Sequence, residues 1–117
     1  MIGRFVKGKV YVFIDAANIL YSQKTLNWRM DYKRLKGYFS EECDLRKIFF
    51  YTGRVGIYNK QNEFLKKLEG LGYMVKAKEV KRIAIAPNIY EWKGNLDVEL
   101  TIDALKNIDN FDTCILM

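Results

Sequence analysis

Apolar and polar stretches alternate along the chain in a way that predicts strands separated by helices. Residues 9–14 are almost continuously apolar. Such runs are typical of a strand that is covered on both faces of a sheet. Residues 46–51, 73–78 and 113–117 are short segments rich in aromatic or aliphatic side chains, and they predict three further strands.

Helical periodicity appears between the first three of these segments. Residues 31–39 predict one helix, since apolar side chains recur three to four positions apart. Its apolar positions are Tyr32, Leu35 and Phe39. Residues 57–71 predict a second, amphipathic helix that ends before Gly72, a residue type common just after helices. Its expected inward residues are Ile57, Phe64, Leu65, Leu68 and Leu71.

The next part of the chain is less regular. Residues 79–93 predict either a hairpin that turns at Pro87 and Asn88 or an open loop. Residues 97–108 then predict a third helix. Its expected inward stripe is Val98, Thr101, Leu105 and Ile108, widened by Leu100 and Ala104.

This order of elements predicts an α/β fold with a parallel sheet and right-handed crossovers. The chain has 117 residues and contains no repeat or linker-like stretch, so we expect residues 1–117 to form a single domain. In such sheets, functional sites form outside the carboxyl ends of the strands. We therefore searched that edge for candidate chemistry.

Composition narrows the classes of function. The chain contains no histidine, which excludes a Ser-His-Asp triad and any histidine acid–base pair. The chain has two cysteines and no histidine, which argues against a finger-type zinc site because such a site takes four cysteine or histidine ligands. The net charge is +6, which favours a polyanionic partner such as RNA, although a solvated lysine-rich surface has the same composition.

Cellular location is also predicted from composition. The chain has no apolar run near the roughly 18 residues that span a bilayer, so we expect no membrane segment. Its first ten residues lack the apolar stretch of a signal peptide. We therefore expect a cytoplasmic protein in which Cys43 and Cys114 are free thiols.

Two carboxylates flank predicted strands at the edge of interest. Asp15 follows the first strand, and Asp97 begins the helix that precedes the last one. Each alone also fits a helix-capping or first-turn acid. Together they predict a shared cation site if their strands are neighbours. With only oxygen ligands available, Mg²⁺ or Mn²⁺ is the expected ion.

Other polar residues accompany this pair. Asp103 lies about 240° around the helix from Asp97, so the two side chains do not share a face. Spacing alone therefore favours a solvated acid at Asp103 over a second ligand beside Asp97. Asn18 is placed to orient Asp15 or a water molecule. Arg54 and Lys93 are candidate phosphate contacts, with an ordinary surface role as the alternative.

Two motifs resemble those of the NYN domains, a branch of the PIN-like metal-dependent nucleases. One is "VFIDAANIL", which resembles the strand-Asp-x-x-Asn signature of that family. The other is "WKGNLDVELTIDAL", which resembles its Lys-Gly…Asp-Val-x-Leu-x-x-Asp helix. The resemblance covers nearly the whole chain.

The resemblance implies a three-layer α/β/α PIN-like domain with a mostly parallel central sheet. It implies a metal-dependent endoribonuclease that hydrolyses RNA phosphodiester bonds with Mg²⁺ or Mn²⁺. The matching catalytic residues are Asp15, Asn18, Asp97 and Asp103. Of these, Asp15 and Asp97 would hold the metal, while Arg54 and Lys93 would contact RNA.

The sequence departs from the family pattern at its end. The family continues after the strand matching residues 113–117 with an acidic Ser-Gly-Asp-Ser-Asp loop, a helix and a strand, whereas the sequence ends at Met117. Either the sequence is a truncated form of the domain or the protein functions without that part of the site. In both cases we expect a domain that lacks the acidic loop and the last helix and strand, and an open sheet edge that favours self-association. A weak or inactive RNA-binding module and a regulatory protein-interaction module remain alternative functions on this fold.

Overall fold

A computed structural model describes residues 4, 6–17, 19, 23, 26–27, 29–54, 59–79, 81–93 and 96–117, with the backbone alone at 54, 59–60, 81–85, 89–93 and 97. The elements are β1 (Lys9–Asp15), α2 (Tyr32–Glu42), β2 (Asp44–Arg54), α3 (Asn59–Gly70), β3 (Met74–Glu79), β4 (Lys81–Ala86), β5 (Ile89–Lys93), α4 (Asp97–Lys106) and β6 (Thr113–Leu116).

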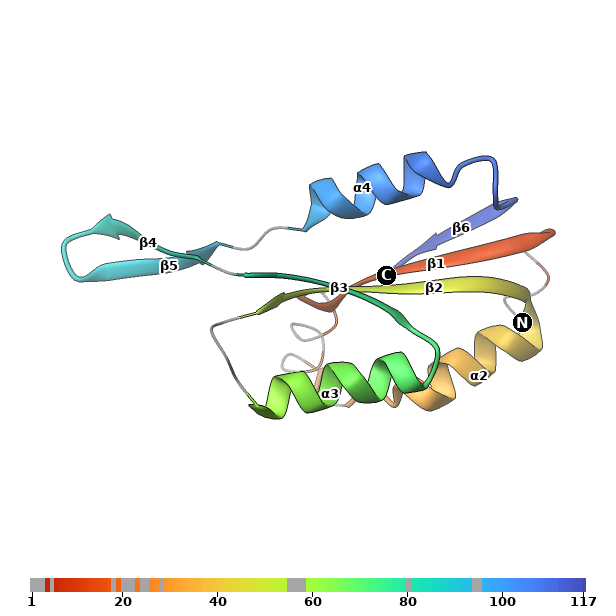
Figure 1. Cartoon of the computed structure of the whole chain (residues 1–117), viewed down its shortest axis with the longest axis horizontal. Helices are drawn as coiled ribbons and strands as arrows, with labels where there is room; N and C mark the ends of the chain where they lie inside the picture. The colour runs from red at the N-terminus through yellow and green to blue at the C-terminus, as the bar shows by residue number, and fades with distance from the viewer. Residues whose placement is uncertain are drawn as a thin grey trace.

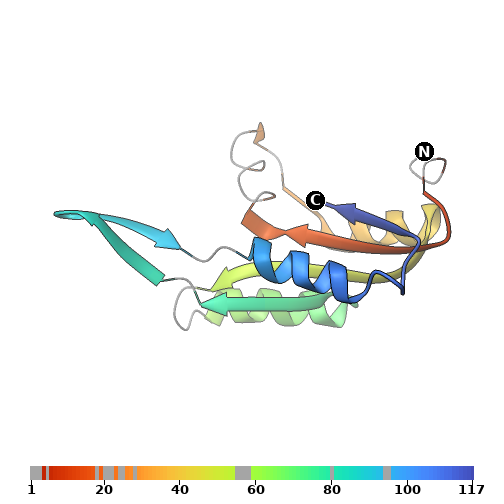
Figure 2. The same cartoon turned by 90° about the horizontal axis from the view of Figure 1, so that it is seen from above.

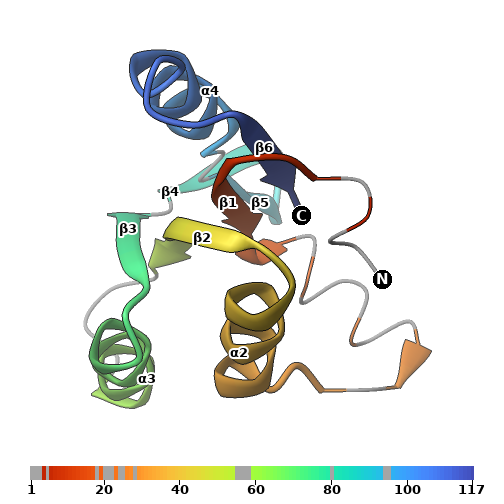
Figure 3. The same ribbon diagram turned by 90° about the vertical axis from the view of Figure 1, so that its right-hand side faces the viewer.

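A parallel four-stranded sheet forms the middle layer, in the order β3-β2-β1-β6. Helices α2 and α3 cover one face, and α4 covers the other (Figure 1, Figure 3). This confirms the predicted three-layer α/β/α architecture. β6 is the outermost strand on its side among the described residues, and self-association through this edge stays a prediction.

β1 lies between two parallel neighbours because its side chains are apolar on both faces. Val10, Val12 and Ile14 are buried against the α2/α3 face. Tyr11 and Phe13 alternate with them and are buried on the α4 face. A strand with this pattern loses apolar burial at an edge, so the sequence favours the central position.

The α2/α3 face is closed by two helices with clear end signals. The side chain of Asp31 caps α2 by accepting a hydrogen bond from the Arg34 backbone N–H at 3.1 Å. Gly72 follows α3 at φ +100°, where a side chain would be strained. Leu65 and Leu68 are buried as predicted, Leu71 is partly buried, and Ile57 lies outside the described residues.

On the α4 face, the predicted inward stripe of the helix is correct only for the two residues expected to widen it, Leu100 and Ala104. The residues that pack against the aromatic sheet face are Leu96, Leu100 and Ala104. The expected inward residues Val98, Thr101, Leu105 and Ile108 are exposed. Apolar side chains occupy both sides of this helix, so hydrophobic spacing did not identify which side contacts the sheet.

Residues 81–93 form the predicted hairpin rather than an open loop. β4 and β5 pair antiparallel, and Asn88 adopts φ +61° in the turn. The hairpin extends away from the sheet on the side where the parallel strands end (Figure 1, Figure 2). It gives the molecule its long axis, with extents of 52 × 29 × 26 Å.

Cys43 and Cys114 are free thiols. Within the described part of the chain, none of the helices is long and apolar enough to cross a membrane.

The two faces predict opposite outcomes for two leucine substitutions. Leu68 is 1% exposed and Leu105 is 61% exposed. Leu68→Ala should lower the free energy of unfolding by about 2–5 kcal/mol, since it leaves a cavity in the core. Leu105→Ala should change it by less than about 0.5 kcal/mol. Urea unfolding of both variants checks this, and equal losses would contradict the observed orientation of α4.

Candidate active site

Asp15 ends β1 at the carboxyl edge of the sheet, as predicted. Its position, two residues after Phe13, places it on the α4 face of the strand. Its backbone N–H donates to the Met117 carbonyl at 2.8 Å, and its carboxylate oxygen Oδ1 accepts from the Ala17 N–H at 3.0 Å. The carboxylate is therefore half-buried and held by the turn that follows β1.

Asp103 reaches the same region from α4. The Tyr51 hydroxyl donates a hydrogen bond of 2.8 Å to Asp103 Oδ2. Tyr51 is also the register partner of Asp15 on the neighbouring strand β2. Tyr51 thus lies beside Asp15 in the sheet and holds Asp103, so Asp103 is a half-buried, hydrogen-bonded acid and not simply a solvated one. Helical spacing relative to Asp97 did not reveal that Asp103 faces a tyrosine on the sheet.

The environment of Tyr51 keeps its hydroxyl protonated. Burial raises the pKa of this phenol, and the hydrogen bond to Asp103 and its negative charge raise the pKa further. The neutral hydroxyl is the form that can donate to a carboxylate. Tyr51 therefore acts as a fixed donor that positions Asp103.

Glu99 is a polar residue of this face that the sequence analysis did not single out. Its Oε1 forms a 2.8 Å ion pair with Lys78 Nζ on β3, and this contact lowers the pKa of Glu99. Its other oxygen, Oε2, is buried and has no hydrogen-bond partner among the described residues. Its position four residues before Asp103 was the available signal, because residues so spaced share a helix face.

Glu99 and Asp103 both line a groove of about 540 Å³ between α4 and β3. The other residues of the groove are Val75, Lys76, Ala77, Lys78, Leu96 and Ile102. The groove is thus bordered by acids from the helix and by lysines from the strand. It is an open groove in which apolar side chains lie between these charged ones.

The remaining predicted site residues are placed by backbone alone or lie outside the described residues. Asp97 is the first residue of α4, and the N-cap position belongs to Leu96, so Asp97 is not the cap. Arg54 and Lys93 end β2 and β5. The side chains of these three residues lie outside the described part, as does all of Asn18.

The oxygen atoms available at this edge are of the type that a hard divalent cation prefers as ligands. Asp15, Glu99 and Asp103 offer carboxylate oxygens, and the buried, unpartnered Glu99 Oε2 is an atom that a cation would satisfy. Among the described residues, however, no three acidic, cysteine or histidine side chains are grouped closely enough to hold a metal ion.

The Tyr51–Asp103 bond predicts a specific stability effect. Tyr51→Phe should lower the free energy of unfolding at pH 8 by about 1–3 kcal/mol, because it leaves a half-buried carboxylate without its donor. Above pH of about 10 an unfolded tyrosine ionises while folded Tyr51 stays neutral, so wild-type stability should fall as pH rises. That fall should be shallower in Tyr51→Phe. Urea unfolding at pH 8 and pH 11 tests this, and identical pH slopes would contradict it.

Comparison with known proteins identifies the family. Residues 9–117 match the NYN domain. Low amplitude and bright protein LabA of Synechococcus elongatus is 31% identical over 116 residues, which cover 96% of this chain and 62% of LabA. The crystal structure of VPA0982, a protein of unknown function from Vibrio parahaemolyticus, shares the fold with a TM-score of 0.74 at 24% identity, over 94% of this chain and 65% of that one.

The chain spans less than two thirds of the length of either relative. The match to the family nevertheless extends from the first strand to the last residue. The chain therefore belongs to the NYN domain family, with its nuclease-like PIN-type fold.

Proposed function

We propose that this domain is a metal-dependent endoribonuclease that hydrolyses RNA phosphodiester bonds. The observation that carries the proposal is the half-buried Asp15 carboxylate at the carboxyl end of the central strand, beside the Tyr51–Asp103 pair. Parallel α/β folds use this edge for ligands. Members of the NYN and PIN-like families generally depend on divalent metals, which agrees with acids at this position.

The residues would divide the work as follows. Asp15 and Asp97 would hold Mg²⁺ or Mn²⁺, and Asp103 would contribute negative charge from its place on Tyr51. When bound, the ion supplies activation of water and stabilises charge that develops on the phosphate. Asn18 would orient the Asp15 carboxylate or the attacking water. The proposed reaction needs no histidine, and the sequence contains none.

RNA would be held mainly through its phosphates. The net charge of +6 favours a polyanion through release of counterions. Arg54 ends β2 and Lys93 ends β5, so both residues lie on segments directed toward the carboxyl edge. We assign both residues to contacts with the RNA backbone. We also propose that the protein is cytoplasmic.

A non-catalytic RNA-binding or regulatory module is the second candidate function. It is favoured by the lack of a group of three metal-ligating side chains among the described residues. Under this alternative, RNA binding would be sensitive to salt, would need no metal and would survive loss of Asp15.

Cleavage of a labelled single-stranded RNA in Mn²⁺ distinguishes the two functions. Asp15→Asn should reduce the cleavage rate at least 100-fold, because it removes a charged ligand while it keeps the size and the hydrogen-bonding capacity of the side chain. Asp109→Asn, at an exposed acid outside the site, should cleave at the wild-type rate. Removal of the metal with EDTA should abolish RNA cleavage by the wild type and by Asp109→Asn.

Two results would count against the endoribonuclease. One is a cleavage rate that Asp15→Asn leaves unchanged. The other is RNA binding without any cleavage in Mn²⁺ or Mg²⁺, which would favour the binding module.

A further inference from the structure

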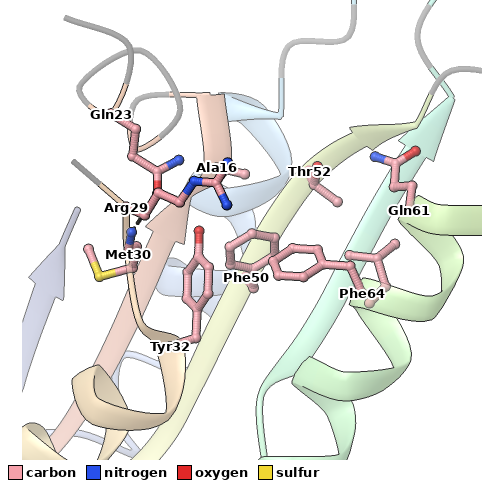
Figure 4. A pocket seen from close by; sticks show the side chains of 10 residues that line it. Ala16, Gln23, Arg29, Met30, Tyr32, Phe50, Thr52, Gln61 and Phe64 are labelled. Atoms are coloured by element: carbon pink, nitrogen blue, oxygen red, sulfur yellow. Dashed lines mark hydrogen bonds between the residues drawn. The ribbon is translucent and has the colours of Figure 1, made fainter. Parts of the chain in front are cut away.

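A second cavity lies at the same edge of the sheet but on the opposite face, under α2 and α3. Its volume is about 440 Å³, within the usual range for small-ligand sites. Figure 4 shows its side chains converging from the segment after β1, from β2 and from both helices. The lining residues are Ala16, Gln23, Arg29, Met30, Tyr32, Phe50, Thr52, Gln61, Phe64 and Leu65.

Three aromatic rings form the apolar wall of this cavity. Tyr32 packs edge-to-face against Phe50 at 5.4 Å and against Phe64 at 5.5 Å between ring centroids. Phe50 and Phe64 are 6.1 Å apart at 76°. These contacts fix the ring orientations, and Phe64 remains 39% exposed toward the opening. The wall therefore offers a preformed aromatic surface to a flat ligand.

Polar groups surround the aromatic wall. Gln61 Nε2 and the Thr52 hydroxyl both donate to the Gly53 carbonyl, at 2.9 and 3.1 Å. The Gln23 carboxamide oxygen accepts from the Met30 N–H at 2.5 Å. Each carboxamide is held through one polar atom and has a second of opposite type, so the pair supplies both a donor and an acceptor.

The charge of the cavity is positive. Arg29 is the lining residue with a formal charge, and no aspartate or glutamate is among the described residues that line the cavity. Figure 4 shows its guanidinium directed across the opening, near Ala16. A guanidinium at an opening without acids favours an anionic group, and phosphate is the group it binds most specifically.

We propose that this cavity binds one nucleotide unit. The base would stack on the ring of Phe64, with the inclined ring of Tyr32 beside it. Its edge would meet the carboxamides of Gln23 and Gln61, and its phosphate would contact Arg29. A hydrocarbon ligand would leave these polar groups unpaired, and a metal ion would lack acidic ligands. The heteroaromatic and anionic parts of a nucleotide match both halves of the cavity.

The place of the cavity connects it to the proposed reaction. Ala16 follows Asp15 directly in the chain, so the cavity begins where the candidate acidic site ends. An RNA strand crossing the carboxyl edge would present a phosphate to Asp15 and a neighbouring base to the cavity. This role as a base pocket rests on the proposed RNA substrate, whereas a free mononucleotide would satisfy the same chemistry.

The test is an amide NMR titration in EDTA, where no metal-dependent cleavage occurs. The probes are 5′-AMP, 5′-UMP and a short single-stranded RNA. The proposal predicts saturable shifts at residues around the cavity. Phe64→Ala should weaken binding about 5- to 150-fold, since it removes the ring on which the base would stack. Tyr38→Ala is the matched control, because Tyr38 is also 39% exposed but lies outside the cavity, and it should bind as wild type.

A second pair of variants keeps the proposal testable if Phe64→Ala disturbs the fold. Arg29→Gln should weaken binding of the phosphate-bearing probes several-fold while the nucleoside adenosine is less affected, and Lys33→Gln on the exposed side of α2 should have no effect. The absence of shifts at the cavity with all probes would overturn the proposal, as would equal affinity in Phe64→Ala, Arg29→Gln and wild type.

The different probes distinguish a pocket for a free nucleotide from a subsite for one nucleotide of an RNA strand. Saturation by a mononucleotide with competition against RNA would identify a pocket open to free nucleotides, and binding of RNA alone would identify a subsite of the strand. All of these titrations are done without metal, so they do not depend on cleavage. An absence of cavity binding would therefore refute the pocket even if the protein cleaves RNA in the separate Mn²⁺ assay. Cavity binding without any cleavage in Mn²⁺ supports the pocket and refutes the nuclease.

Discussion

The fold depends on one constraint, the burial of both faces of β1. Val12 and Ile14 need the cover of α2 and α3, while Tyr11 and Phe13 need α4. This requirement places β1 between β2 and β6, with a helical layer on each side. Asp15 is the residue at which the buried strand reaches the solvent, so the carboxylate is held at the end of a strand that is packed on both faces. Catalytic groups gain from such placement because positioning contributes to rate.

The sequence was sufficient to predict most of the fold because local signals agreed with burial. Continuous apolar character identified β1, and Gly72 marked the end of a helix. It failed on the orientation of α4, where Leu100 and Leu105 are equally apolar and lie on different sides. Only the packing against the aromatic rings of the sheet selects Leu100.

The candidate site was predictable in part for the same reason. Asp15 was identified from its place after a strand, a signal carried within a few residues. The bond between Tyr51 and Asp103 joins residues 52 positions apart, and the ion pair between Lys78 and Glu99 depends on how α4 lies over β3. Such contacts arise from tertiary packing, which one-dimensional spacing does not encode. The aromatic cavity under α2 and α3 has the same origin, since its walls come from four separate segments.

The central claim is that Asp15 belongs to a divalent-metal site, and direct binding of Mn²⁺ is the measurement that tests it most directly. Titration of free Mn²⁺ by its EPR signal, with wild type and Asp15→Asn at equal concentration, reports binding without any RNA. The account predicts saturable binding by the wild type and at least tenfold weaker binding by the variant. Equal Mn²⁺ affinity in the two proteins, or none in either, would contradict it.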